Sequence, residues 1–196
     1  MSYPTLRLHP RKEESVLRFH PWIFSGAIAS FSAPVEDGDL VSVVDSKGRP
    51  LGTGHFGGGS IAVRLLSFDA EEVIDRAFYK RRLEAALRLR LSCDLVRPVG
   101  SSDSPNTTYR LVHGEGDSLP GLIIDIYDRT AVVQAHSLGM HQARQTIAEV
   151  LWEVFAEAGD PVLPLEGIYY KSETTLPTRD MRELASDGFL IGHTEA

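Results

Sequence analysis

Turn-forming clusters recur through the first 68 residues at intervals that leave no room for a long helix. Gly, Asp and Ser dominate these clusters, and they favour turn conformations. The clusters separate short apolar runs, which favours strands at residues 5–8, 22–28, 40–45, 50–56 and 61–68. The segment 11–20 could form a short helix before the second strand. Five short strands at this spacing predict a small barrel or sandwich.

The pattern changes at residue 69. Asp69 followed by Glu72 resembles a capping box, and the run that follows has the composition of a helix. We interpret residues 69–98 as a helix that links two units. Residues 97–108 are rich in Ser, Asp, Asn and Pro, which indicates a polar loop.

The remaining residues, 99–196, predict a small α/β unit in the order strand, strand, helix, strand. Apolar residues at helical spacing predict a helix over 139–158, which Gly159 ends. The predicted strands of this unit are residues 109–113, 122–128, 130–136, 167–172 and 187–192. His136 and His141 flank the start of the helix, where they could cap it or face solvent. The fold class is therefore α+β.

The two halves of the chain differ in charge. Residues 1–98 carry 14 Lys and Arg against 12 Asp and Glu, whereas residues 99–196 carry 6 against 15. The net charge of −7 argues against a nucleic-acid partner, but a local basic patch still binds phosphate because screening limits the reach of distant charges. We therefore expect two units with different surfaces.

Composition also excludes some classes of protein. No apolar run is long enough to span a membrane, and the N-terminal residues lack the apolar core of a secretory signal. The single cysteine, Cys93, can form no internal disulfide and no cysteine-based zinc site, and a lone thiol is compatible with a reducing cytoplasm. We expect a cytoplasmic protein that has no membrane partner.

Two glycine-rich segments have the composition of ligand-binding loops. Residues 52–57, GTGHFG, match G-x-G-x-x-G, but a β-rich run follows where a cofactor loop needs a helix, so a turn-rich hairpin is the better interpretation. Residues 113–121, HGEGDSLPG, contain His113, Glu115 and Asp117. These three residues could form a metal or catalytic site or dock a partner, but their spacing is more typical of a structural turn.

The stretch HPWIFSGAI, residues 20–28, places aromatic residues directly after several cations. Phosphates need cations, and unpaired bases need planar groups on which to stack. Trp22 and Phe24 share one face of the expected strand, opposite Ile23, and could either stack on bases or form the core face of the barrel. The predicted RNA-binding residues are Arg11, Lys12, Arg18, His20, Trp22, Phe24, Lys47, Arg49 and Arg64.

Three segments together resemble bacterial 23S rRNA cytosine-5 methyltransferases that begin with a PUA domain. They are HPWIFSGAI after the basic run, YRLVHGEGDSLPGLIIDIYDRTAVVQAHSLGM at 109–140, and IYYKSE at 168–173. The resemblance covers the chain to about residue 190. It implies a PUA-like RNA-binding barrel at 1–68 and a small α/β domain at 99–196 placed before a catalytic domain.

The resemblance also implies what this chain lacks. The family's S-adenosylmethionine (SAM) domain, with its cofactor loop and catalytic cysteine motifs, has no counterpart in these residues. We therefore expect no catalytic residues, cofactor or metal in this chain, which would be a truncated RNA-binding portion inactive by itself. The expected partners are rRNA and a methyltransferase domain. The alternatives are a stand-alone PUA-type RNA-binding protein or an enzyme that uses the 113–121 loop.

Overall fold

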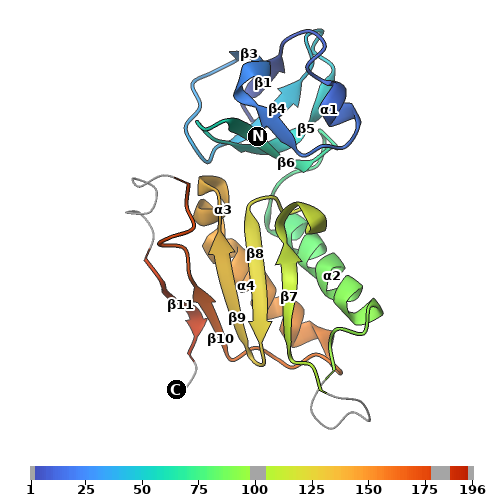
Figure 1. Ribbon diagram of the computed structural model, residues 1–196, viewed down its shortest axis with the longest axis vertical. Coiled ribbons are helices and arrows are strands. Elements are labelled where there is room, and N and C mark those ends of the chain that lie inside the picture. The colour runs from blue at the N-terminus through green and yellow to red at the C-terminus, as the bar shows by residue number, and fades with distance from the viewer. Residues whose placement is uncertain (1–2, 98–104, 178–185, 194–196) are drawn as a thin grey trace. The chain divides into compact units, whose positions relative to one another are not determined.

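The computed structural model describes residues 3–97, 105–177 and 186–193, and it divides into two compact units (Figure 1). The first unit comprises residues 1–74 together with 137–139, and the second comprises residues 75–136 and 140–196. Most of the polar loop predicted at 97–108 lies outside the described residues.

A six-stranded sheet curls around the apolar core of the first unit (Figure 1). The strand order is β2-β6-β5-β4-β1-β3, with β1 parallel to β4 and the other neighbours antiparallel. The strands are β1 (Thr5–Leu8), β2 (Trp22–Phe24), β3 (Ile28–Phe31), β4 (Leu40–Val44), β5 (Pro50–Phe56) and β6 (Ile61–Ser67). The predicted α+β class, with an N-terminal β-rich unit, is confirmed.

Two elements of this unit are shorter than the sequence suggests. The strand predicted at 22–28 stops at Phe24, because the 3₁₀ helix η1 (Ser25–Ala27) turns the chain into β3, which pairs with β1. The helix predicted within 11–20 is only α1 (Glu14–Leu17). Arg11 and Phe19 on either side of it have positive φ angles of 66° and 61°, which a helix cannot accommodate.

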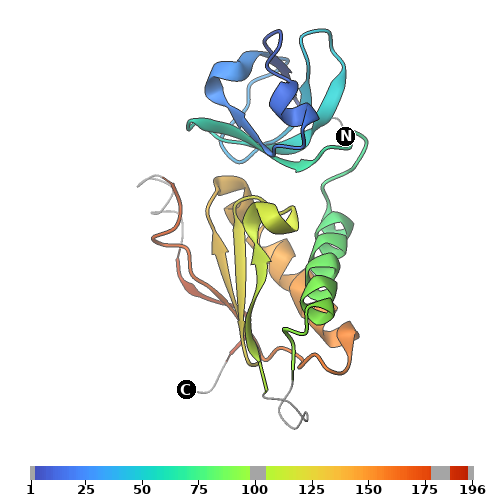
Figure 2. The same ribbon diagram turned by 45° about the vertical axis from the view of Figure 1, so that its right-hand side comes forward.

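The second unit is a five-stranded sheet of order β11-β10-β9-β8-β7. Figure 2 shows its two long helices, α2 (Arg76–Ser92) and α4 (Arg144–Ala158), on the same side of this sheet. The strands are β7 (Thr108–His113), β8 (Leu122–Tyr127), β9 (Thr130–Ala135), β10 (Gly167–Tyr170) and β11 (Gly188–Gly192). The predicted hairpin around residues 128–129 is confirmed as β8 and β9, which pair throughout their length.

The ends of the two helices correct the sequence analysis. Asp75, not Asp69, is the N-cap of α2, because its side chain accepts a hydrogen bond from the N–H of Phe78 at 2.9 Å. Asp69 instead accepts a bond from the N–H of Glu71 in a preceding turn. The helix predicted at 139–158 is divided into α3 (Leu138–Gln142) and α4 at Ala143. None of the helices in the described segments has the length and apolar character needed to cross a bilayer.

Candidate nucleic-acid interface

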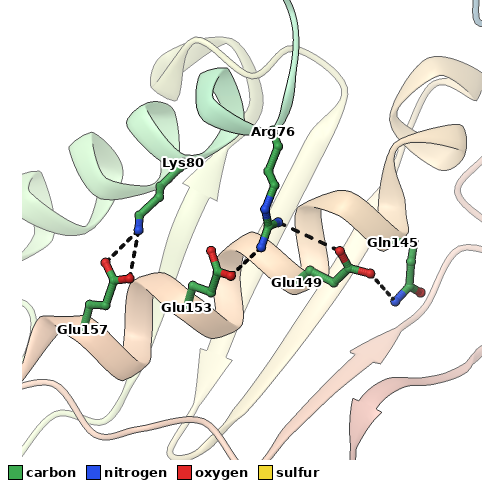
Figure 3. A network of polar contacts seen from close by, with 6 residues as sticks. All are labelled: Arg76, Lys80, Gln145, Glu149, Glu153 and Glu157. Atoms are coloured by element: carbon green, nitrogen blue, oxygen red, sulfur yellow. Dashed lines mark hydrogen bonds and ion pairs between the residues drawn. The ribbon is translucent and has the colours of Figure 1, made fainter.

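Two basic residues of α2, Arg76 and Lys80, pair with acidic residues of α4 inside the second unit. Figure 3 shows Arg76 between Glu149 and Glu153, one helical turn from the pair that Lys80 makes with Glu157. Lys80 Nζ lies 2.7 Å from Glu157 Oε2, and this hydrogen bond raises the pKa of Lys80. These pairs are partly exposed, so each contributes little to stability, but they give Arg76 and Lys80 carboxylate partners within the second unit.

The net positive charge of the first half of the sequence therefore comes from a helix of the second unit. Residues 76–92 contain six Lys and Arg and one Glu, whereas residues 1–74 contain seven Lys and Arg and nine Asp and Glu. The first unit thus has a net charge of −2. Any phosphate-binding surface on it must be a local group of cations.

Lys47 and Arg49 lie in the turn between β4 and β5, where buried Asp45 orders the backbone. Asp45 Oδ1 accepts hydrogen bonds from the backbone N–H groups of Lys47 and Arg49 at 2.9 and 2.8 Å. Arg49 Nε also donates to Asp45 Oδ2 at 3.1 Å. The bond from the Arg49 backbone is the largest cause of the lowered pKa of Asp45. Arg49 therefore already has a carboxylate partner, which makes it a weaker candidate for phosphate contact than a solvent-facing cation.

The residues of β2 have the predicted alternation, but the core face is the opposite one. Ile23 is 2% exposed and belongs to the core, whereas Phe24 is 52% exposed and Trp22 is half-buried. The reason is the register with β6, in which Ile23 pairs with the buried Val63 and Trp22 pairs with Arg64. The alternative that Trp22 and Phe24 form the core face of the barrel is wrong.

Four predicted contact residues lie together in sequence around α1. Arg11, Lys12, Arg18 and His20 are all exposed. Within the described residues, Arg11, Lys12 and Arg18 have no carboxylate within ion-pair distance. His20 faces Trp22, with ring centroids 5.7 Å apart, and its Nδ1 accepts a hydrogen bond from the Trp22 backbone at 3.2 Å. The segment 11–24 thus combines exposed cations that form no ion pair among the described residues with aromatic rings, of which that of Phe24 is exposed.

Sequence reasoning missed one aromatic residue of this segment. Phe19 is 74% exposed, the largest value among the big apolar side chains of the described residues. Its ring meets Phe68 edge to face, with centroids 5.3 Å apart. Its place in a predicted helix next to Arg18 and His20 gave no signal, because the exposure depends on the left-handed turn that ends α1.

The G-x-G-x-x-G segment is strand β5 rather than a loop. A Cβ atom at Gly54 would lie 2.2 Å from the carbonyl oxygen of Arg64, and one at Gly52 would lie 2.3 Å from that of Ser67. The glycines therefore allow β5 to approach β6 closely. The neighbouring strand already fills the space beside Gly52 and Gly54, so these residues offer no cradle for a nucleotide or for SAM.

The 113–121 loop is held by a buried ion pair. Arg90 of α2 binds both carboxylate oxygens of Asp117, and these side chains are 10% and 4% exposed. Asp117 Oδ2 also accepts the backbone N–H of His113 at 2.6 Å, and Arg90 Nε donates to the carbonyl of Arg110 at 2.9 Å. Both oxygens of Asp117 are thus engaged, which supports the structural-turn interpretation.

A hollow of about 590 Å³ opens beside this loop. The residues that line it include Leu89, Cys93, Leu95, His113 and Asp117. Cys93 is exposed at the C-terminal end of α2. The C-terminal end of a helix carries partial negative charge, so it does not stabilise the thiolate form of a cysteine.

His141 is buried, which corrects the expectation that it caps a helix or faces solvent. Its Nδ1 lies 2.7 Å from the hydroxyl of Tyr170, which is on β10. Burial is the main cause of its lowered pKa, with a contribution from Arg144. His136 is exposed. His141 therefore acts in the packing of the second unit.

The curled sheet and its short helix define the class of the first unit. Residues 6–68 match the family described as PUA-like domain. The first unit is therefore a PUA-like domain, and the resemblance noted in the sequence is confirmed for this part of the chain.

Two relatives extend the similarity to the second unit. Ribosomal RNA large subunit methyltransferase I of Klebsiella pneumoniae (strain ATCC 700721 / MGH 78578) is 34% identical over 191 residues, which are 97% of this chain and 44% of that protein. The protein of the same description from Shewanella amazonensis is 40% identical over 153 residues, or 78% of this chain and 37% of that protein. The chain is homologous to these proteins and spans less than half of their length.

A solved structure shares the fold. A candidate SAM-dependent methyltransferase from Streptococcus mutans superposes on the whole chain with a TM-score of 0.74 and 17% identity, over 44% of its own length. At this identity the likeness concerns the fold, which combines a PUA-like unit with the five-stranded α/β unit.

Proposed function

We propose that this chain is the rRNA-binding portion of a SAM-dependent rRNA (cytosine-5) methyltransferase. The observation that carries the proposal is the cluster of exposed cations around α1, Arg11, Lys12 and Arg18, which form no ion pair with any carboxylate in the part of the chain that the structure describes. The cluster lies in a PUA-like domain, in a chain homologous to proteins named as large-subunit rRNA methyltransferases. The second unit, which is net acidic and pairs Arg76, Lys80 and Arg90 of α2 with carboxylates, would orient this domain.

Physical chemistry favours RNA as the partner of this surface. Guanidinium and ammonium groups that lack a carboxylate partner gain most from phosphates, because each contact releases condensed counterions. The uncharged part of the same segment, Trp22 and Phe24, offers planar surface to unpaired bases. A protein partner with an acidic face would use the cations but leave the rings without a role.

Removing the three cations should weaken RNA binding and reduce its dependence on salt. For the variant Arg11→Ala/Lys12→Ala/Arg18→Ala we expect the affinity for large-subunit rRNA fragments at low salt to fall at least about tenfold. The slope of log affinity against log salt concentration should become smaller by about 2, as expected for the loss of three phosphate contacts on a single strand. Filter-binding titrations between about 50 and 200 mM salt measure both quantities.

The matched control is Arg88→Ala, which removes one exposed cation from α2 in the second unit. This variant should bind RNA as the wild type does. Affinity that stays constant between low and high salt, or an equal loss in Arg88→Ala, would contradict the proposed surface.

We also propose that this chain alone does not catalyse methyl transfer. Methylation of C5 of cytosine needs a thiolate that attacks C6, beside a site for the methyl donor. The glycine-rich strand does not fit SAM, because the carbonyl oxygens of Arg64 and Ser67 already fill the space above its glycines. Cys93, the single cysteine of the chain, lies on an exposed helix end.

Purified chain incubated with labelled SAM and rRNA should transfer no methyl group above background. The same preparation must bind RNA, so that inactivity is not a result of misfolding. Turnover that disappears in Cys93→Ser would contradict this part of the proposal and would place the chemistry in the hollow beside α2.

Two alternatives remain distinct in their consequences. A stand-alone RNA-binding protein would show the same titrations without any methyltransferase domain in the same reading frame. An enzyme that uses the 113–121 loop would need a carboxylate available for chemistry, and Asp117, one of the two carboxylates there, is engaged by Arg90 and by the backbone of His113. The ion pair therefore favours binding over catalysis by this loop.

A further inference from the structure

Phe19 occupies a backbone position that helices usually give to glycine. After α1, the N–H of Phe19 bonds the carbonyl of Val16 at 2.9 Å, and the N–H of His20 bonds that of Ser15 at 3.0 Å. This pair of bonds is a Schellman motif, in which the residue with left-handed backbone is most often glycine because other side chains are strained there. Phenylalanine is thus an unfavourable choice for the backbone.

The side chain of Phe19 contributes little packing to the fold. Phe19 is 74% exposed and packs one edge contact against Phe68. The strained backbone lowers stability, and the exposed ring buries too little area to offset that cost, so neither packing nor turn geometry explains the residue. Strained positions of this kind concentrate where a protein binds something.

A second residue of the same segment repeats the pattern. Arg11 has φ 66° in the turn closed by the bond from the Lys12 N–H to the His9 carbonyl at 3.1 Å. Left-handed backbone at this point of a turn again favours glycine or asparagine. The two strained residues flank α1, which packs its Val16 into the core of the first unit. Arg11 supplies a cation, and Phe19 supplies an aromatic ring.

We infer that Phe19 stacks on an unpaired RNA base whose flanking phosphates are bound by Arg11, Lys12 and Arg18. This inference rests on the proposed function and adds the kind of RNA recognised, a single-stranded nucleotide rather than a duplex. Bases inside a duplex are already stacked and paired, so they cannot reach a surface ring, whereas unpaired bases gain about five- to hundredfold in affinity from one.

Binding of a short single-stranded RNA and of the blunt duplex of the same sequence tests the inference. In Phe19→Gly we expect the affinity for the single strand to fall about tenfold and the affinity for the duplex to change less than twofold. The melting temperature should stay unchanged or rise by a few degrees, because glycine relieves the strained backbone. Loss of binding without loss of stability is a result that a purely structural role for Phe19 would not give.

Two further variants separate stacking from bulk. Phe19→Leu keeps an apolar side chain but has no ring plane, so it should lose affinity as Phe19→Gly does. Phe19→Trp should bind within about threefold of the wild type. A 2-aminopurine base in the single strand should be quenched by the wild type and not by Phe19→Leu. Leu17→Ala removes a 52% exposed aliphatic side chain of α1. It should change neither the affinity for the single strand nor the 2-aminopurine fluorescence of the complex.

Normal single-strand binding by Phe19→Gly or Phe19→Leu overturns the inference, as does an equal loss on single strand and duplex. These failures leave the proposed function intact if the Arg11, Lys12 and Arg18 variant still loses salt-dependent binding. Absence of RNA binding by the wild type would contradict both the inference about Phe19 and the proposed function.

Discussion

Replacing Asp117 with alanine is expected to remove about 3 to 5 kcal/mol from the stability of the second unit. The change leaves the Arg90 guanidinium, whose side chain is 10% exposed, without its counter-charge. It also leaves the N–H of His113 without its acceptor. Because a domain is stable by only about 5 to 15 kcal/mol, a loss of this size would unfold a large fraction of the unit on mild heating.

The two tryptophans of the chain allow each unit to be followed separately. Trp22 lies in the first unit and Trp152 in the second, so urea unfolding of Asp117→Ala in a Trp22→Phe background reports the second unit alone. The control is Glu166→Ala, which breaks the exposed pair with Arg129 and should cost less than about 1 kcal/mol. The double variant Arg90→Met/Asp117→Ala should recover part of the loss, because no buried charge is then left unpaired.

This result decides between two interpretations of the 113–121 loop. If the loop were a catalytic site, Asp117→Ala would abolish an activity and leave stability within about 1 kcal/mol of the wild type. If the loop is a structural turn, Asp117→Ala lowers the stability by about 3 to 5 kcal/mol and abolishes no activity. The ion pair with Arg90 and the bond from His113 predict the second outcome.

Local patterns in the sequence were sufficient for most of the fold. The hairpin of β8 and β9 follows from alternating apolar residues on either side of Asp128 and Arg129, and the buried face of α4 follows from apolar spacing. The break at Ala143 and the cap at Asp75 were missed. Both depend on which of several acceptable residues ends a helix, a choice that tertiary packing makes.

The position of the positive charge could not be predicted in the same way. The sequence counts the cations of α2 with the N-terminal half, but Arg76 and Lys80 pair with residues about seventy positions later. Such pairs are invisible to any window along the chain. Among the described residues, Arg11, Lys12, Arg18 and Lys47 keep the role expected from the sequence as solvent-facing cations without an ion pair, and direct contact with RNA stays a prediction.

Exposure of aromatic residues was the least predictable feature of the candidate interface. Alternation along 22–24 correctly separates Ile23 from its neighbours, but it gives no indication of which face is buried. Phe19 is exposed because α1 ends after four residues in a left-handed turn. A phenylalanine in that turn runs against backbone preference, so no propensity rule would place it there.

Gly54→Ala should destabilise the PUA-like unit by roughly 3 kcal/mol or more, since an added methyl group meets backbone rather than a movable side chain. The new Cβ would lie 2.2 Å from the carbonyl oxygen of Arg64 and 2.7 Å from the Cα of Leu65. β5 would have to move away from β6 and lose ladder hydrogen bonds at the centre of the six-stranded sheet. Urea unfolding of this variant in a Trp152→Phe background, followed through Trp22, measures the loss.

Gly59→Ala is the matched control, because a Cβ there meets no atom within 4 Å. It should change the stability by less than about 0.5 kcal/mol. If the segment GTGHFG were instead a cofactor loop, Gly54→Ala would leave the unfolding curve unchanged and remove binding of SAM or a dinucleotide. A stable Gly54→Ala variant would thus contradict the close approach of β5 to β6, and with it the assignment of this glycine motif to sheet packing rather than to the chemistry of methyl transfer.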